Sequence, residues 1–158
     1  MSTRCQIGFY EQEEKDLNKF EALIYRHSDG YPDGEHGVLA AIMPFLHWWQ
    51  KGRGVMDFEY CSARLLQYLC NKYDGYSKAI GETMSEAGAI FSPEKIEEFT
   101  GTLGHGISNA FHGDIEYLYA VRPNRVEVYK VGYEGDDINK KAELVQVDHL
   151  LVKSPITI

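Results

Sequence analysis

Polar and apolar side chains alternate in residues 5–10 and again in residues 20–27. In the first of these segments, Ile7 and Phe9 fall on one side of an extended chain. An apolar side chain at every second position is typical of a strand with one buried face. The pattern therefore predicts two strands, connected by the acidic and polar residues 11–19.

The apolar period changes to that of a helix in the middle of the chain. Apolar side chains recur every three or four positions in residues 38–51, and glycines follow as a stop signal. Pro44 should kink this helix or break it. A second helix is predicted over residues 57–73, with Asp57 as its cap. A short third helix is predicted to begin at residue 92 with a Ser-Pro pair and to end at the next glycine.

Strand patterns return in residues 115–121, 125–131 and 144–152, and a short turn joins the first two. The main elements follow one another in the order β-β-α-α-β-β-β, without the β-α-β rhythm of a doubly wound fold. The sequence therefore predicts an α+β fold with a single, mainly antiparallel sheet of about five strands and helices packed on one face. Neither a repeat nor a linker divides the chain, so residues 1–158 are expected to form one domain.

Composition is that of a globular protein, with 44% hydrophobic and 13% aromatic residues in 158. The net charge of -8 opposes non-specific binding to nucleic acid, which depends on Lys and Arg replacing counterions at the phosphates. A local basic pocket or a basic protein partner is still compatible with that charge.

The setting that this sequence predicts is a reduced cytoplasm. Its three cysteines, Cys5, Cys61 and Cys70, lack the spacing of a zinc ribbon or of a redox pair. Its apolar runs are shorter than the roughly 18 to 20 residues that cross a bilayer, and its polar start does not resemble a signal peptide. We therefore expect neither secretion nor insertion into a membrane.

A first concentration of polar chemistry lies where the second predicted strand runs into a glycine-rich loop. Its candidate ligand-binding side chains are Arg26, His27, Asp29 and Tyr31. A cation, an imidazole and a carboxylate in one segment can bind an anion, orient a polar ligand or help to hold a metal. The same residues also suit a purely structural turn, because Asp, Gly and Pro fix such loops.

A second concentration lies in residues 104–114, just ahead of the strand at 115–121. It contributes His105, His112 and Asp114 as candidate ligand-binding side chains. Glycine beside histidine lets backbone N–H groups approach a ligand, and a nearby aspartate can orient an imidazole. A tight hairpin turn would explain the His-Gly-Asp segment equally well.

The two loops together hold enough ligands for a divalent metal ion if they meet in space and His36 joins them. No pair of these ligands has the fixed helical spacing of a His-x-x-x-His site. Neither a nucleophile elbow nor a phosphate-binding loop is present, so the pattern assigns no catalytic residue and identifies no cofactor.

Three segments of the chain resemble a family of small uncharacterised proteins encoded by phages, prophages and other prokaryotic genomes. They are the opening Met-Ser-Thr-Arg, the Tyr-Arg-His-Ser-Asp-Gly-Tyr-Pro segment at 25–32 and the His-Gly-Asp-Ile-Glu-Tyr-Leu-Tyr segment at 112–119. The resemblance implies a genomic context rather than an activity. It also favours treating the two polar loops as one site.

Our leading hypothesis from the sequence is an accessory protein that binds a small anionic or nucleotide-like ligand. The pocket would be formed by the loops at 26–37 and 104–114, with the sheet as its floor. A metal-dependent hydrolase that uses the same His and Asp residues is the first alternative. The second is an acidic interaction module, in which carboxylates that include those of residues 11–16 engage a basic host protein.

Overall fold

The computed structural model describes residues 3–55, 57–86 and 104–150, and in 73–86 it describes the backbone only. The predicted short helix that begins at residue 92 and the end of the last predicted strand at 151–152 lie outside the described residues. The strands are β1 Cys5–Phe9, β2 Ala22–Arg26, β3 His105–Ile107, β4 Tyr117–Arg122, β5 Arg125–Val131 and β6 Ala142–His149. The helices are α1 Val38–Gly52, α2 Phe58–Glu86 and α4 Ile138–Lys141.

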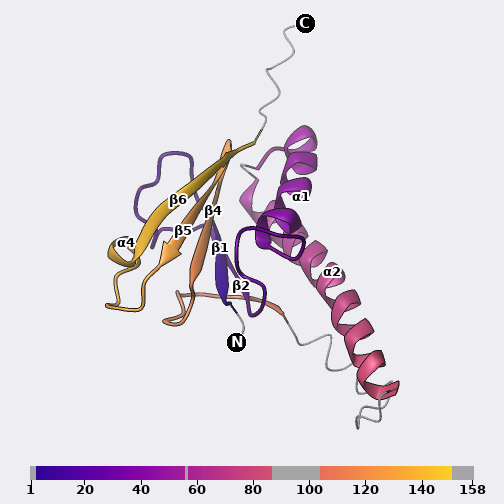
Figure 1. Ribbon diagram of the computed structural model, residues 1–158. Coiled ribbons are helices and arrows are strands. Elements are labelled where there is room, and N and C mark those ends of the chain that lie inside the picture. Colours follow the sequence, from indigo (N-terminus) through magenta and orange to yellow (C-terminus); the bar gives the residue numbers. More distant parts are fainter. Residues whose placement is uncertain (1–2, 56, 87–103, 151–158) are drawn as a thin grey trace, which may run out of the picture.

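The fold is α+β, as the sequence predicts, but the predicted sheet of about five mainly antiparallel strands is wrong. Six strands form one mixed sheet in the order β3-β2-β1-β4-β5-β6 (Figure 1). Strands β1 and β4 pair in parallel, whereas every other neighbouring pair is antiparallel. The sequence pattern missed β3 because three residues with a central glycine show no alternation that could identify a strand.

Helix α1 runs through Pro44 without a break, so the proline does not interrupt it. Proline removes one backbone hydrogen bond to the residue four positions earlier, here Ala40. Both residues lie on the exposed side of α1, where water can satisfy the freed carbonyl. Helix α2 extends to Glu86, well past the predicted end at residue 73. Within the described residues, no helix is long and apolar enough to cross a membrane.

The two long helices lie together on one side of the sheet, which we call the helix face (Figure 1). The alternation of β1 sends Cys5, Ile7 and Phe9 to this face, where they pack with α1 and α2. The neighbouring side chain Gln6 points to the opposite side, which we call the second face. A separate apolar cluster covers the second face and includes Tyr10, Leu17, Leu23, Ile115, Leu118, Ala120, Val131 and Ile138.

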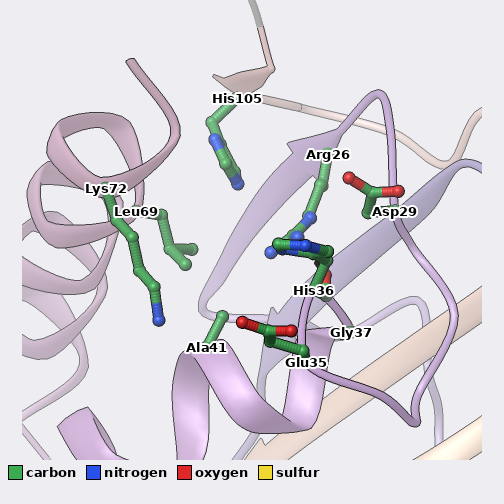
Figure 2. A pocket seen from close by; sticks show the side chains of 9 residues that line it. All are labelled: Arg26, Asp29, Glu35, His36, Gly37, Ala41, Leu69, Lys72 and His105. Carbon is green, nitrogen blue, oxygen red and sulfur yellow. Dashed lines mark hydrogen bonds between the residues drawn. The ribbon is translucent and has the colours of Figure 1, made fainter. Parts of the chain in front are cut away.

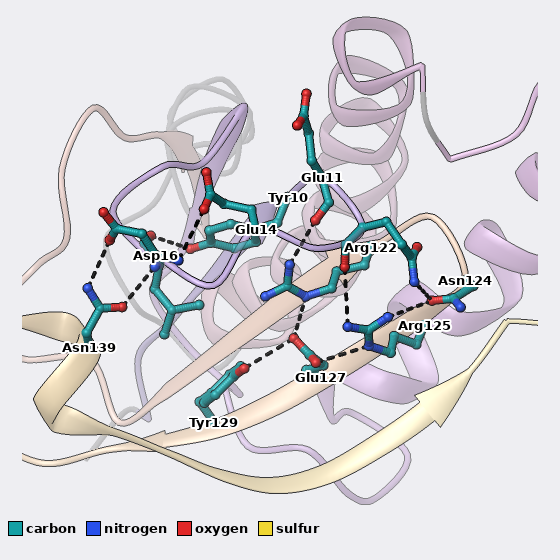
Figure 3. A network of polar contacts seen from close by, with 12 residues as sticks. Tyr10, Glu11, Glu14, Asp16, Arg122, Asn124, Arg125, Glu127, Tyr129 and Asn139 are labelled. Carbon is teal, nitrogen blue, oxygen red and sulfur yellow. Dashed lines mark hydrogen bonds and ion pairs between the residues drawn. The ribbon is translucent and has the colours of Figure 1, made fainter.

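A buried ion-pair network fastens the connection between β1 and β2 to the second face (Figure 3). Glu127 on β5 accepts hydrogen bonds from Arg122 Nε at 2.5 Å, from Arg125 Nε at 3.0 Å and from the Tyr129 hydroxyl at 3.1 Å. Arg122 Nη1 also donates to the carbonyl oxygen of Glu11 at 2.8 Å. The network therefore ties the sheet to the backbone of the connection between β1 and β2.

Two carboxylates of the acidic stretch at 11–16 form hydrogen bonds that stabilise the loop. The Asp16 carboxylate accepts a hydrogen bond from Asn139 Nδ2 at 2.9 Å (Figure 3). It also accepts one from the backbone N–H of Asn18 at 3.0 Å. The Glu14 carboxylate accepts from the Asp16 N–H at 3.3 Å. These two carboxylates hold the loop together and dock it on α4.

Replacing Glu127 with Gln should destabilise the protein by about 3 kcal/mol or more at pH 7, because it leaves the buried Arg122 charge uncompensated. Burial alone would raise the pKa of Glu127, but the hydrogen bonds and charges of Arg122 and Arg125 hold it below its usual 4.5. The stabilisation is therefore present above pH 4.5 and is lost as the pH falls through the lower, folded-state pKa.

Urea unfolding at several pH values measures this effect, and the difference between the wild-type protein and Glu127→Gln should shrink below pH 4.5. Glu134→Gln, on an exposed turn, is the matched control and should leave the stability almost unchanged. A difference that stays constant down to pH 2 would show that the carboxylate charge contributes nothing.

Candidate functional site

The glycine-rich loop folds back tightly after β2. The Gly30 N–H donates to the carbonyl of Thr3 at 2.9 Å, and the buried Tyr119 hydroxyl donates to the Gly30 carbonyl at 2.6 Å. A Cβ at Gly30 would lie 2.8 Å from that Thr3 oxygen, so a larger residue does not fit. Asp29 adopts a φ of 54°, which Asp tolerates better than most residues.

A second glycine lets the loop approach the start of α1. A Cβ at Gly37 would lie only 2.3 Å from the carbonyl oxygen of Asp33, so this crossing requires glycine. The N–H groups of Val38 and Leu39 donate to Tyr31 and Pro32 in the loop. The loop thereby holds the N-terminus of α1 beside the end of β2.

A cavity of about 180 Å³ lies on the helix face, between the end of β2, the loop, the start of α1 and α2 (Figure 2). The turn of the loop brings residues far apart in sequence to one place. The polar side chains that line it are Arg26, Asp29, Glu35, His36, Lys72 and His105.

The buried cation of this cavity is Arg26, whose side chain lies on the helix face with only 5% of the residue exposed. Its Nε donates to the carbonyl of Ser28 at 2.9 Å and its Nη2 to the carbonyl of His36 at 3.0 Å. Across the parts of the chain that the structure describes, no carboxylate forms an ion pair with this guanidinium and no group accepts from Nη1. A permanently charged group is therefore buried with only neutral carbonyl partners.

The residues beside Arg26 in the sheet are neutral as well. Cys5 pairs with it from β1, and burial raises the pKa of that thiol to about 12. His105 pairs with it from β3, and burial together with the Arg26 charge lowers the pKa of the imidazole to about 3. Neither neighbour supplies a negative charge to balance Arg26 at neutral pH.

The start of α1 adds a second source of positive potential to the cavity. The N-cap residue is Gly37, which has no side chain to cap the helix, and the first turn contains no acidic residue. The N–H groups of Val38 and Leu39 are already used by the loop, so α1 favours an anion here through its aligned peptide dipoles. Gly37 and Ala41 both line the cavity, so this end of the helix borders it directly.

Opposite charges stand at the mouth of the cavity. Figure 2 shows Lys72 reaching toward it from α2 and Glu35 from the loop, and both residues are exposed. The Asp29 carboxylate accepts a hydrogen bond from the Tyr31 hydroxyl at 3.2 Å. The acids of the site are thus at its rim or engaged with the loop, while the guanidinium lies inside.

The structure divides the seven predicted site residues between the two faces of the sheet. Arg26, Asp29 and His105 line the cavity, and Tyr31 supports Asp29 from beside it. Because side chains of a strand alternate, Tyr25 of β2 projects to the second face instead. The prediction that both loops meet in one pocket therefore holds for His105 only.

The other three predicted residues gather around Tyr25. His112 stacks on its ring with centroids 4.2 Å apart, and His27 Nδ1 lies 2.9 Å from its hydroxyl. Asp114 forms an ion pair with Arg4. These contacts hold the 108–116 loop on the second face. The second polar segment therefore lies on the opposite side of the sheet from Arg26.

Sequence reasoning missed the contribution of α2 to the site. Lys72 lies three residues after the buried Leu69 and seven after the buried Leu65, so it extends their side of the helix. That spacing was visible in the sequence, but nothing in it indicated that this side of α2 faces Arg26.

A metal site finds no counterpart in the described part of the chain. Within residues 3–55, 57–72 and 104–150, no three His, Cys, Asp or Glu side chains converge in a way that could hold a metal ion.

Comparison with protein-family models, curated proteins and solved structures finds no match to this chain. The resemblance to phage and prophage proteins thus stays a prediction. A function can be proposed from the residues that line the cavity.

His105 should stay neutral throughout the physiological range, because protonation would place a second positive charge beside Arg26 in a buried position. In a ¹H–¹³C NMR titration, its ring signals should not move between about pH 8 and pH 5, whereas a free imidazole titrates near 6.5. The unfolded chain takes up this proton below pH 6.5, so the site costs stability as the pH falls toward 3.

His105→Gln identifies the signal by its loss and should lessen the acid sensitivity of folding between pH 6.5 and pH 3. An inflection near pH 6.5 in the His105 signal would contradict this description of the cavity.

Proposed function

We propose that the protein binds a small oxyanion, or the anionic group of a small molecule, in the cavity that contains Arg26. The observation that carries this proposal is the buried guanidinium without a carboxylate partner in the described chain. A buried charge is stable only when it is paired or well solvated by hydrogen bonds. An anion at Nη1 would supply the missing charge and accept the available N–H groups.

The size of the cavity favours a small ligand. Pockets for drug-sized molecules usually measure roughly 300–1,000 Å³, whereas this one measures about 180 Å³. A phosphate or short carboxylate fits that space, and a whole nucleotide does not. If the ligand is nucleotide-like, its phosphoryl group would occupy the cavity and its remaining parts would lie outside the mouth.

Charge and hydrogen bonding divide the roles of the lining residues. Arg26 would donate to the anion from inside, and the positive end of α1 would favour the same charge. Lys72 would add long-range attraction from the exposed mouth, where its contribution should be small and salt-dependent. Neutral His105 would not alter the charge preference of the cavity.

Titration with inorganic phosphate tests this assignment by isothermal calorimetry in a buffer without competing oxyanions. Arg26→Met should raise the Kd at least about tenfold, because a hydrogen bond to a charged group contributes roughly 1.5–3 kcal/mol. Lys72→Met should raise it only about twofold to fivefold, with an effect that disappears at high salt.

Arg64→Met is the matched control, since it removes an exposed arginine of α2 that hydrogen-bonds to Gln67. Circular dichroism establishes that each variant is folded, and Arg26→Lys separates charge from the forked geometry of the guanidinium. Wild-type protein that binds neither phosphate nor acetate, or folded Arg26→Met that binds phosphate as well as wild type, would refute the proposal.

A further inference from the structure

Strand β6 forms one edge of the sheet, and several of its apolar side chains are exposed to solvent. Leu144, Val145 and Val147 expose 49%, 51% and 37% of their surface, although such residues are usually buried. The strand is eight residues long, whereas β3 at the other edge has three. A long edge strand presents a row of backbone donors and acceptors to any chain that can pair with it.

Natural proteins protect long edges with lysines, prolines or bulges. Residues 142–149 contain neither Lys nor Pro. A register shift in the ladder with β5 does occur opposite Val128 and Tyr129, and it leaves Val145 without a partner in that ladder. This bulge interrupts the ladder with β5 at one residue only, and the apolar side chains around it stay exposed.

The sequence of β6 is complementary to itself in one antiparallel register. Placing Leu144 opposite Val145 of a second copy puts Ala142 opposite Val147 and Glu143 opposite Gln146. Apolar residues then face apolar residues, and no two like charges stand opposite each other. The other registers near it place apolar residues opposite polar ones, or Glu143 opposite Asp148, and both arrangements are unfavourable.

Charges at the two ends of β6 favour the same register. Lys141 directly precedes the strand and Asp148 is close to its end, and among the described residues neither forms an ion pair. In the register with Leu144 opposite Val145, Lys141 of one copy stands opposite Asp148 of the other. The two-fold axis repeats this pair, so each dimer would contain it twice.

We infer that a second copy of this chain pairs with β6 in antiparallel orientation, so that two six-stranded sheets join into one. The interface is isologous, because the same strand contributes from both copies. Backbone hydrogen bonds supply the pairing, the exposed apolar residues supply buried area, and Lys141 with Asp148 determines the register.

The dimer would leave the proposed anion site unobstructed. Arg26 lies on β2, next to the edge strand β3, while β6 is at the opposite end of the sheet. The two proposals are therefore independent, and a monomeric variant should bind phosphate with the same Kd as the wild-type protein.

Light scattering after size exclusion tests the interface on the full chain. The wild-type mass should be twice 18.0 kDa at concentrations of roughly 100 µM. Val145→Lys should weaken association about tenfold or more, because the added charge would be buried at the edge. Trp48→Lys changes another exposed apolar residue, on α1, and should leave the dimer intact.

A charge exchange tests the register itself. Lys141→Asp and Asp148→Lys should each weaken the dimer about fivefold, and the double variant should restore it, because the two opposite charges face each other again. A wild-type mass of 18.0 kDa at all concentrations would overturn the proposal. A dimer unaffected by Val145→Lys would also overturn it, and a double variant weaker than both single ones would exclude this register.

Discussion

Arg26 is a permanently charged side chain buried with two backbone carbonyls and no carboxylate in the described chain. Its two neighbours in the sheet, Cys5 and His105, are neutral at physiological pH and supply no negative charge to balance it. The loop after β2 holds the N-terminus of α1 against the same space and adds positive potential. These features support the proposal that the cavity binds a negative charge from outside the chain.

Side chains of β2 point alternately to the two faces of the sheet, and this separates the cavity from the polar residues around Tyr25. On β2, Arg26 projects to the helix face, while Tyr25 projects to the second face and stacks with His112. The ion pairs of Glu127 lie on the second face, on the opposite side of the sheet from Arg26 (Figure 3). A change in the polar loops of one face should consequently have little direct effect on the chemistry of the other.

Local patterns in the sequence predicted the elements better than their arrangement. Period-two alternation identified the long strands and the helical period identified α1 and the first half of α2. The parallel pairing of β1 with β4 could not be predicted, because strand neighbours depend on long-range contacts that leave no local pattern. For the same reason the sequence grouped His112 with Arg26 and His105, whereas the structure places only the latter two at the cavity, and the sequence gave no sign of Lys72.

We propose that Arg26, which forms no ion pair with any described residue, binds an external anion. A crystal soaked in selenate tests it directly, because selenate has the shape and charge of a phosphate-like dianion and gives an anomalous X-ray signal. The account predicts an anomalous peak within hydrogen-bond distance of Arg26 Nη1, beside the start of α1. A side-chain carboxylate of the protein at Nη1, with selenate bound only elsewhere, would contradict it.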